Sequence, residues 1–259
     1  MTTSQMHSGI TITPIGGIKL VEPGDDVAAL LLDGLQVSGL ALEDGDILAV
    51  AQKIVSKAEG RQVDLATVLP SPEACRLASE TEKDPRLVQL ILDESTEVVR
   101  KKPGVLIMRH NLGLVGAHAG VDQSNIDHDD GGSALLLPED PDASAARIRR
   151  ALVAATGRHL GVLVTDSANR PWRLGTVGIA IGAAGLTALD DRRGGTDLYG
   201  RELKVTLVNR ADSLASAATL AMGETTERTP AALIRGFATE DSGQSAADIP
   251  RPLDEDLFR

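Results

Sequence analysis

The stretch HLGVLVTDSANRPWRLGTVGIAIGAAGL (residues 159–186) contains two segments that decide the fold class. Its first part is an apolar run that is typical of a buried strand and that stops at Asp166. A strand that ends in an acid at a loop commonly aims the carboxylate into a cleft. Its second part, residues 175–186, is rich in Gly and Ala, which predicts close approach of its backbone to a neighbour or a ligand.

Outward from this stretch, the chain shows more strand patterns than helix patterns. The run Ile47 to Val55 reads as a strand that delivers Lys53, Lys57 and Arg61 to a sheet edge. Further strands are expected at residues 9–15, 103–109, 201–210 and 231–236.

Four segments are expected to be helical. They are residues 23–35 with Asp25 or Asp26 as cap, residues 84–100, a helix capped by Asp142 or Ser144 that ends at Gly157, and residues 211–224 capped near Asp212. Strands and helices do not alternate strictly, so we predict an α+β fold with mostly antiparallel pairing.

Composition places the chain among soluble proteins and disfavours some partners. Of 259 residues, 42% are hydrophobic and 24% charged, which is ordinary for a folded chain. A net charge of −11 and only 2% aromatic residues disfavour binding to nucleic acid. The single cysteine, Cys75, cannot form an intrachain disulfide and is expected to be a buried or inert thiol. No signal peptide or membrane span is expected, which favours a cytoplasmic location and no membrane partner.

Familiar catalytic motifs do not occur. The sequence has no phosphate loop of the G-x-x-x-x-G-K-[ST] type, no G-x-G-x-x-G between a strand and a helix, and no G-x-S-x-G elbow. Its histidines lack zinc-ligand spacing; they are His7, His110, His118, His128 and His159. Any nucleotide must therefore bind by another route.

Oxygen-bearing side chains form the remaining candidate site. These are Asp122 with Asn125, Asp166 with Ser167, and Glu224. Such groups suit Mg²⁺ or Mn²⁺. Each also has an ordinary structural reading: a turn for the first pair, a loop or cap for the second, and a solvated helix end for the third.

The candidate basic residues are equally ambiguous one by one. Lys53 and Lys57 could form a solvated rim, and His118 reads as a packing residue. Arg170 and Arg173 could form a salt-bridged loop around Trp172. Local chemistry alone therefore indicates no more than a metal-dependent enzyme that handles phosphate.

Several long motifs, taken together, resemble the coenzyme F420-0 gamma-glutamyl ligase family in its stand-alone form. They are PGDDVAALL, DGDILAVAQKIVSKAEGR, NLGLVGAHAGVDQSN, LLPEDPDASAARIR, GVLVTDSANRPWRLGTVGIAIGAAGL, DLYGRELKVTLVNRADSLASAATLAMGE and ALIRG. They occur in the family's order and cover the chain to about Gly236. Residues 1–238 would form the ligase domain, with two intertwined subdomains in a homodimer, and residues 239–259 an acidic, proline-containing tail that is peripheral.

The resemblance implies an activity: GTP-driven attachment of L-glutamate to the terminal carboxylate of coenzyme F420-0, followed by further gamma-linked glutamates. It implies an acyl phosphate intermediate, with GDP and phosphate as products and no side chain as nucleophile. Two divalent ions, Mg²⁺ or Mn²⁺, would be held by Asp122, Asp166, Ser167 and Glu224, and K⁺ would assist. The implied nucleotide contacts are Ile18, Lys19, Leu20, Val21, Gln52, Lys53, Lys57, Asn125, Met222, Gly223, Thr225, Thr226, Glu227, Arg228 and Thr229.

The chain departs from the family pattern at a few positions. The segment GGIKLV, with Lys19, lacks the proline common in the family, and Asn169, Thr176 and Gly178 replace other residues. These departures could change acceptor recognition, although no metal-ligand position is lost. Two further readings stay open: a metal-dependent, nucleotide-driven amide ligase that acts on a different carboxylate, and a non-catalytic protein that binds nucleotide or F420, which would require loss of a metal ligand.

Overall fold

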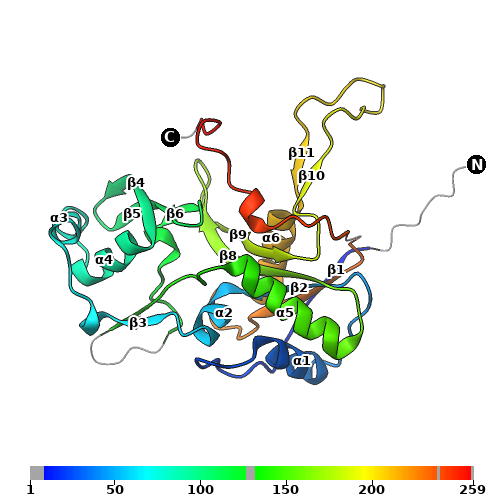
Figure 1. The fold of residues 1–259 in the computed structure, drawn as a ribbon, viewed down its shortest axis with the longest axis horizontal. Helices are drawn as coiled ribbons and strands as arrows, with labels where there is room; N and C mark the ends of the chain where they lie inside the picture. Colours follow the sequence, from blue (N-terminus) through cyan, green and yellow to red (C-terminus); the bar gives the residue numbers. More distant parts are fainter. Residues whose placement is uncertain (1–8, 127–131, 238–239, 258–259) are drawn as a thin grey trace, which may run out of the picture.

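A five-stranded sheet forms the centre of the molecule (Figure 1). The computed structural model describes residues 9–126, 132–237 and 240–257. The strand order is β1 (Thr11–Pro14), β12 (Ala231–Arg235), β2 (Ile47–Ala51), β8 (Gly161–Asn169) and β9 (Thr176–Ala184). Only β2 and β8 run parallel in this sheet; its other neighbours are antiparallel, which confirms the α+β prediction.

Helices cover both faces of this sheet. α1 (Val27–Val37), α2 (Gln52–Ala58) and α5 (Pro141–Thr156) pack on one face, and α6 (Arg210–Met222) packs on the other. Along β2, Leu48 and Val50 join the core with α1 and α5, whereas Ile47 and Ala49 face α6. Burial on both faces explains why β2 and β8 read as continuous apolar runs.

Glycines in β9 let both helix layers approach the sheet closely. A Cβ at Gly178 would lie 2.5 Å from the Ala215 carbonyl oxygen of α6. A Cβ at Gly182 would lie 2.2 Å from the Pro141 carbonyl oxygen of α5. The Gly- and Ala-rich run therefore packs closely against neighbouring backbone, as expected.

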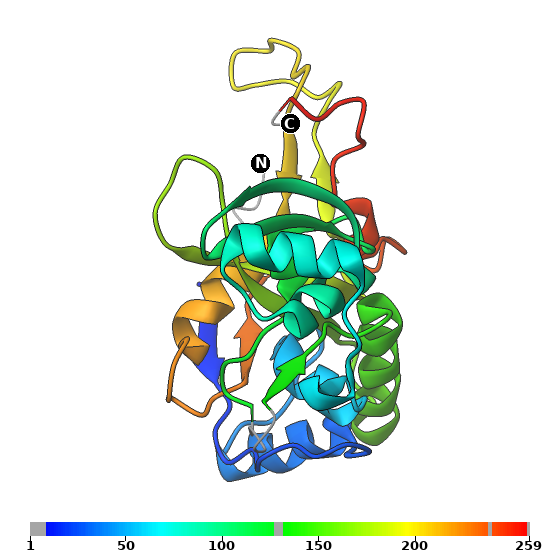
Figure 2. The same cartoon turned by 90° about the vertical axis from the view of Figure 1, so that its left-hand side faces the viewer.

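A smaller group of elements, here called the small lobe, lies beside the central sheet in Figure 1 and in front of it in Figure 2. Helices α3 (Pro72–Thr81) and α4 (Pro85–Asp93) cover a sheet of β4 (Ser95–Lys102), β5 (Val105–His110) and β6 (Val115–Ala117). The pair β3 (Gln62–Asp64) and β7 (Ser133–Leu135) joins the lobe to the rest. Short 3-10 helices occupy Leu65–Thr67 and His118–Gly120.

A projecting pair of strands, here called the arm, and the C-terminal tail complete the fold (Figure 1). The arm consists of β10 (Leu189–Asp191), β11 (Leu207–Asn209) and the residues between them. The tail, expected to be peripheral, is anchored by a 3-10 helix, Ala246–Asp248, whose Ala246 and Ala247 amides donate to the Asp142 carboxylate. The described helices include none that is both long enough and apolar enough to cross a bilayer.

The main error of the sequence prediction concerns the run Ile47 to Val55. Its strand ends at Ala51, and α2 follows at once. Lys53 and Lys57 therefore lie one helical turn apart on the same face of a helix rather than at a strand end. Ile54 and Val55 of α2 are buried, because the helix packs back onto the sheet that the strand has just left.

A second error concerns β8, which continues to Asn169 instead of stopping at Asp166 because its residues 162–169 pair with β9. The pairing shifts register between Val164 and Thr165, which marks a β-bulge or irregularity. Bulges re-aim side chains and are common beside active sites. Asp166 thus lies within a strand, not at a loop.

Other boundaries also differ. α1 is capped by Asp26, one of the two caps expected for it. α5 is capped by Asp140 and α6 by Asn209, and neither residue was the expected cap. Residues 95–100, expected to end a helix, belong to β4, and the strand expected at 201–210 is limited to β11. Cys75 is exposed, not buried. His7, His128 and the boundary after residue 238 lie outside the described residues.

Candidate functional site

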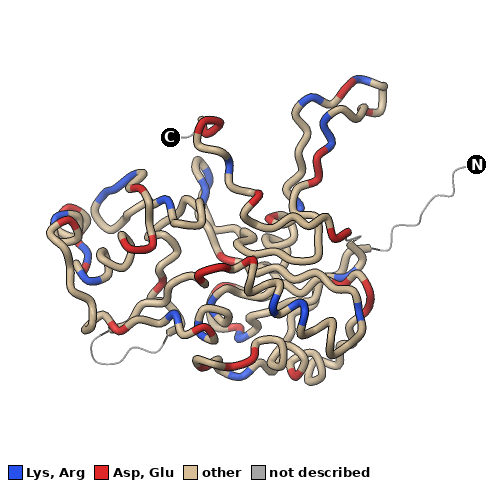
Figure 3. Tube along the Cα trace, viewed as in Figure 1, with Lys and Arg blue, Asp and Glu red and all other residues tan. Residues whose placement is uncertain are grey.

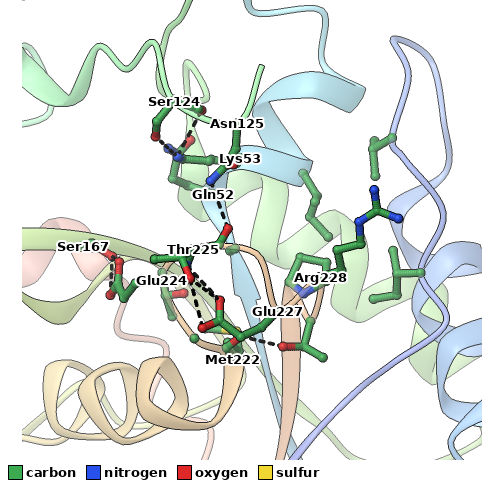
Figure 4. Close-up of a pocket in the computed structure, with 18 of the residues that line it drawn as sticks. Gln52, Lys53, Ser124, Asn125, Ser167, Met222, Glu224, Thr225, Glu227 and Arg228 are labelled. Carbon is green, nitrogen blue, oxygen red and sulfur yellow. Dashed lines mark hydrogen bonds between the residues drawn. The ribbon is translucent and has the colours of Figure 1, made fainter. Parts of the chain in front are cut away.

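A cavity of about 690 Å³ opens where several chain segments converge (Figure 4). Its walls come from the start of α2, the middle of β8, the loop after β6, and the connection from α6 to β12. This volume lies in the range of small-molecule sites. The fold thus brings distant parts of the sequence to one concave surface.

Every site residue predicted from the sequence lines this cavity. The acidic and hydroxyl group comprises Asp122, Asp166, Ser167 and Glu224. The expected nucleotide contacts are Ile18, Lys19, Leu20, Val21, Gln52, Lys53, Lys57, Asn125, Met222, Gly223, Thr225, Thr226, Glu227, Arg228 and Thr229.

The sequence prediction missed some lining residues. These are Ala51, Ile54, Ser124, Thr165, Thr219 and Pro230. Ser124 and Thr165 are adjacent in sequence to predicted site residues. A hydroxyl side chain next to a candidate ligand could therefore have indicated that they line the cavity. Thr219 lies three residues before Met222 on α6, a spacing that puts both on one helix face.

On one wall of the cavity, Lys53 is held against the loop after β6. Its Nζ lies 2.7 Å from Oδ2 of Asp122 and donates to Ser124 Oγ at 2.7 Å. Burial alone would raise the pKa of Asp122, but the hydrogen bonds from Lys53 and Ser124 lower it. Lys57 Nζ donates to the carbonyl oxygen of Asn125 at 2.8 Å. Asn125 has a φ of 55°, so a turn is present here together with the charge pairing.

On the opposite wall, a second set of acids lies on and near β8. Ser167 Oγ is 2.8 Å from both carboxylate oxygens of Glu224 (Figure 4). Burial raises the pKa of the Asp166 carboxyl to about 6 despite a hydrogen bond from the Ser167 backbone, and the negative charges of Asp122 and Glu224 add to the rise. The positive charge of Lys53 lowers the pKa of Asp166 but does not offset the effects of burial and of the two neighbouring carboxylates.

The connection from α6 to β12 closes the cavity with a tight loop. Its Gly223 has a φ of 79°, and a Cβ there would lie 2.3 Å from the Glu227 carboxyl carbon. Glu227 accepts a hydrogen bond from the Thr225 amide at 2.8 Å, and Asn125 Nδ2 reaches the Thr225 carbonyl oxygen at 3.4 Å. Arg228 has a φ of 56°. Backbone in such conformations is often retained at binding sites, where the surroundings stabilise it.

The donor chemistry of the cavity fits a hard divalent cation. Carboxylate and hydroxyl oxygens are the ligands that Mg²⁺ and Mn²⁺ prefer, and Mg²⁺ often takes only one or two carboxylates plus water and substrate phosphates. Among the described residues, no group of three or more His, Cys, Asp or Glu side chains is close enough to hold an ion alone. A cation here would therefore share its ligands with the substrate.

Other candidate residues lie away from the cavity. Arg61 Nε donates to the Leu137 carbonyl oxygen at 2.8 Å, so its role is to join chain segments. Within the described ranges, Arg170 and Arg173 form no ion pair, which contradicts the expected salt-bridged loop. His118 is half-buried, and burial lowers the pKa of its imidazole.

Comparison with known proteins shows a clear relationship. Residues 17–236 match the model of the family described as F420-0:Gamma-glutamyl ligase. The chain is 46% identical to a protein of Methanothermobacter thermautotrophicus named coenzyme F420:L-glutamate ligase, over 97% of this chain and 99% of that one. A protein of the same name from Methanopyrus kandleri is also 46% identical, over 96% and 98% of the two chains. One from Archaeoglobus fulgidus is 40% identical, over 96% of each.

Proposed function

Since this chain belongs to the F420-0:gamma-glutamyl ligase family and is an enzyme of the ligase class, we propose that it uses GTP to attach L-glutamate to coenzyme F420-0. The observation that carries this proposal is the single cavity in which Asp122, Asp166 and Glu224 lie with Lys53 and Lys57. A site of mixed charge suits a reaction between anionic substrates, because each anion needs a positive partner when it leaves water.

The proposed reaction has two steps. A carboxylate is a poor electrophile, so an oxygen of the acceptor carboxylate first takes the γ-phosphoryl group of GTP, which gives an acyl phosphate and GDP. The amine of glutamate then attacks the acyl carbon, the C–O bond to phosphate breaks, and the amine loses a proton. Repetition on the new γ-carboxylate would lengthen the chain. No protein nucleophile is needed, because the intermediate forms on the substrate.

The chain's own residues would act mainly by charge and position. Phosphoryl transfer depends on neutralised charge and in-line placement more than on covalent help. Lys53 and Lys57 supply fixed positive charge in a chain of net charge −11. Asp122, Asp166, Ser167 and Glu224 would hold two divalent ions, Mg²⁺ or Mn²⁺, which neutralise phosphate charge when bound. K⁺ would assist as a monovalent cofactor.

The remaining cavity walls would hold the nucleotide. The segments Ile18 to Val21 and Met222 to Thr229 face the cavity from two sides. Gln52 is buried and its Oε1 accepts from Ser56 Oγ at 2.9 Å, which fixes the amide in place. Such a fixed amide offers a directional contact to a base.

We infer a homodimer from the arm. Large apolar side chains lie exposed between its strands: Leu198, Tyr199 and Val205 are 99%, 95% and 86% exposed. A projecting element with this surface is costly to leave in water, so a second copy of the chain would cover it. Light scattering of Tyr199→Ser should then show more monomer than the wild type.

Product mass tests the proposal. Wild-type protein with Mg²⁺, K⁺, GTP, L-glutamate and F420-0 should raise the acceptor mass by one glutamyl unit or more, with one GDP released per unit. Replacement of GTP by ATP, and of K⁺ by Li⁺, should slow the reaction. Phosphate release with folate-like or peptide carboxylates but not with F420-0 would favour another acceptor. Nucleotide binding without any turnover would favour a non-catalytic role.

A further inference from the structure

The connection between β8 and β9 stands clear of the rest of the chain (Figure 2). It begins at Arg170, three residues after Ser167 on the cavity wall, and holds Pro171, Trp172, Arg173 and Leu174. An extended strand advances about 3.3 Å per residue, so the connection begins about 10 Å beyond Ser167. A substrate seated in the cavity can therefore extend along it.

Trp172 is an unusual residue for its position. It follows Pro171 in a turn and has a φ of 62°, a conformation that favours Gly or Asn there and is an outlier for a bulky side chain. Burial of the side chain does not offset this backbone strain, since the residue is 80% exposed. Residues in such sparsely populated conformations cluster at active sites and ligand-binding sites.

The charge of this connection is also distinctive. Arg170 and Arg173 flank Trp172, and residues 168–176 contain no acid although the net charge of the chain is −11. Figure 3 shows acidic and basic residues spread over the rest of the chain. Arg170 donates to the Gly175 carbonyl oxygen at 3.4 Å, and within the described part of the chain neither guanidinium has a carboxylate partner. Two guanidinium groups beside an indole favour a planar aromatic ligand that also carries negative charge.

We propose that the β8–β9 connection binds the acceptor substrate, with Trp172 stacked on its ring system and Arg170 and Arg173 paired with its anionic side chain. The inference rests on the proposed function, because F420-0 is a deazaflavin, a planar ring that carries phosphate and carboxylate groups. The strand then continues from the ring-binding residues to Ser167 and Asp166, so the acceptor would be aligned along β8 with its terminal carboxylate in the cavity.

The variant Trp172→Gly removes the indole ring and also relieves the backbone strain, so it tests the ring without a loss of stability. Glycine suits the positive φ, so the melting temperature should stay the same or rise. Loss of a stacking contact should raise the dissociation constant and KM for F420-0 about tenfold, with the KM for GTP unchanged. The double variant Arg170→Gln with Arg173→Gln should weaken acceptor binding by a similar factor, more at low salt than at high salt. Arg150→Gln, which removes an exposed charge from α5, is the matched control and should leave both constants unchanged.

The readout is fluorescence titration of F420-0 against the full chain, with steady-state kinetics on the same samples. Equal acceptor binding in wild type and Trp172→Gly would overturn this inference while the proposed function stands. The inference would also be overturned if the dissociation constant for F420-0 stayed the same while self-association of the protein changed. That result would identify the connection as a contact between copies of the chain. Failure of the wild type to bind or extend F420-0 would overturn the inference and the proposed function together.

Discussion

Two partly buried carboxylates, Glu94 and Asp166, differ in how their charge is compensated. Glu94 Oε2 lies 2.9 Å from Nη2 of Arg61 and 3.4 Å from Nε2 of His110. Burial would raise the pKa of Glu94, but His110 and Arg61 lower it. Burial raises the pKa of Asp166 to about 6, and the carboxylates of Asp122 and Glu224 add to it. Glu94 finds its cation within the protein, whereas the raised pKa of Asp166 suits the proposal that its cation arrives with substrate.

The largest expected effect is on catalysis. Asp166→Asn and Asp122→Asn should each lower kcat by about a thousandfold, the scale for loss of a group that stabilises charge in the transition state. Both variants should remain folded by circular dichroism and should scatter light as the wild type does, because among the described residues Asp166 pairs with no buried cation and Lys53, the partner of Asp122, is partly exposed. Near-normal GDP release in either variant would remove that residue from the proposed metal site.

The opposite pattern is expected at the compensated carboxylate. Arg61→Met leaves Glu94 without its guanidinium, and breaking such a pair should lower the free energy of unfolding by about 3 kcal/mol. The kcat of the folded protein should not change, since Arg61 does not line the cavity. Arg76→Met, whose partners Glu73 and Glu80 are on the surface of α3, is the control and should have no resolvable effect on urea unfolding. If both variants lowered the free energy of unfolding equally, the Arg61–Glu94 pair would stabilise the protein no more than a surface ion pair does.

The pH dependence of stability gives a third test. An acid whose folded-state pKa lies above its unfolded value binds a proton more readily when folded, so its contribution falls as pH rises from about 4 to about 6. Allowing for solvent screening, the loss is about 1 to 2 kcal/mol. Metal-free wild type should therefore lose more stability than Asp166→Asn over this range, as measured by urea unfolding at each pH. Parallel stability curves for the two proteins would contradict the raised pKa.

The smallest effect is expected from Ser167→Ala. This change removes the hydroxyl that lies 2.8 Å from both oxygens of Glu224. One hydrogen bond contributes about 1 kcal/mol, so kcat/KM should fall about fivefold. A loss as large as that of Asp166→Asn would show that Ser167 contributes as much as a carboxylate to the proposed metal site, rather than as little as a single neutral ligand.

The sequence predicts the central strands and the membership of the cavity better than it predicts local boundaries. Apolar runs at 161–165 and 231–234 required no tertiary information, because strands buried on both faces are recognisable by composition. The motifs of the family led to residues as far apart as Lys19 and Glu224, which share one cavity. Their individual roles toward metal and nucleotide stay predictions.

What the sequence could not predict depends on contacts between distant residues. α2 has seven residues and no side-chain cap, so its helical form follows from packing rather than from local signals. Asp142 was one of the two caps expected for α5, yet it accepts from the Ala183, Ala246 and Ala247 amides of β9 and the tail. Arg61 pairs with Glu94, 33 residues away, and with Leu137, 76 residues away. No local pattern encodes such partners.

The most direct test of the account is a titration of Mn²⁺ in the presence of GDP, followed by electron paramagnetic resonance of the free ion. The account predicts that wild type and Arg61→Met bind two ions per chain with the nucleotide, and that Asp166→Asn binds fewer and more weakly. Equal Mn²⁺ binding by wild type and Asp166→Asn would contradict the claim that Asp166 is there to hold a cation that accompanies GTP.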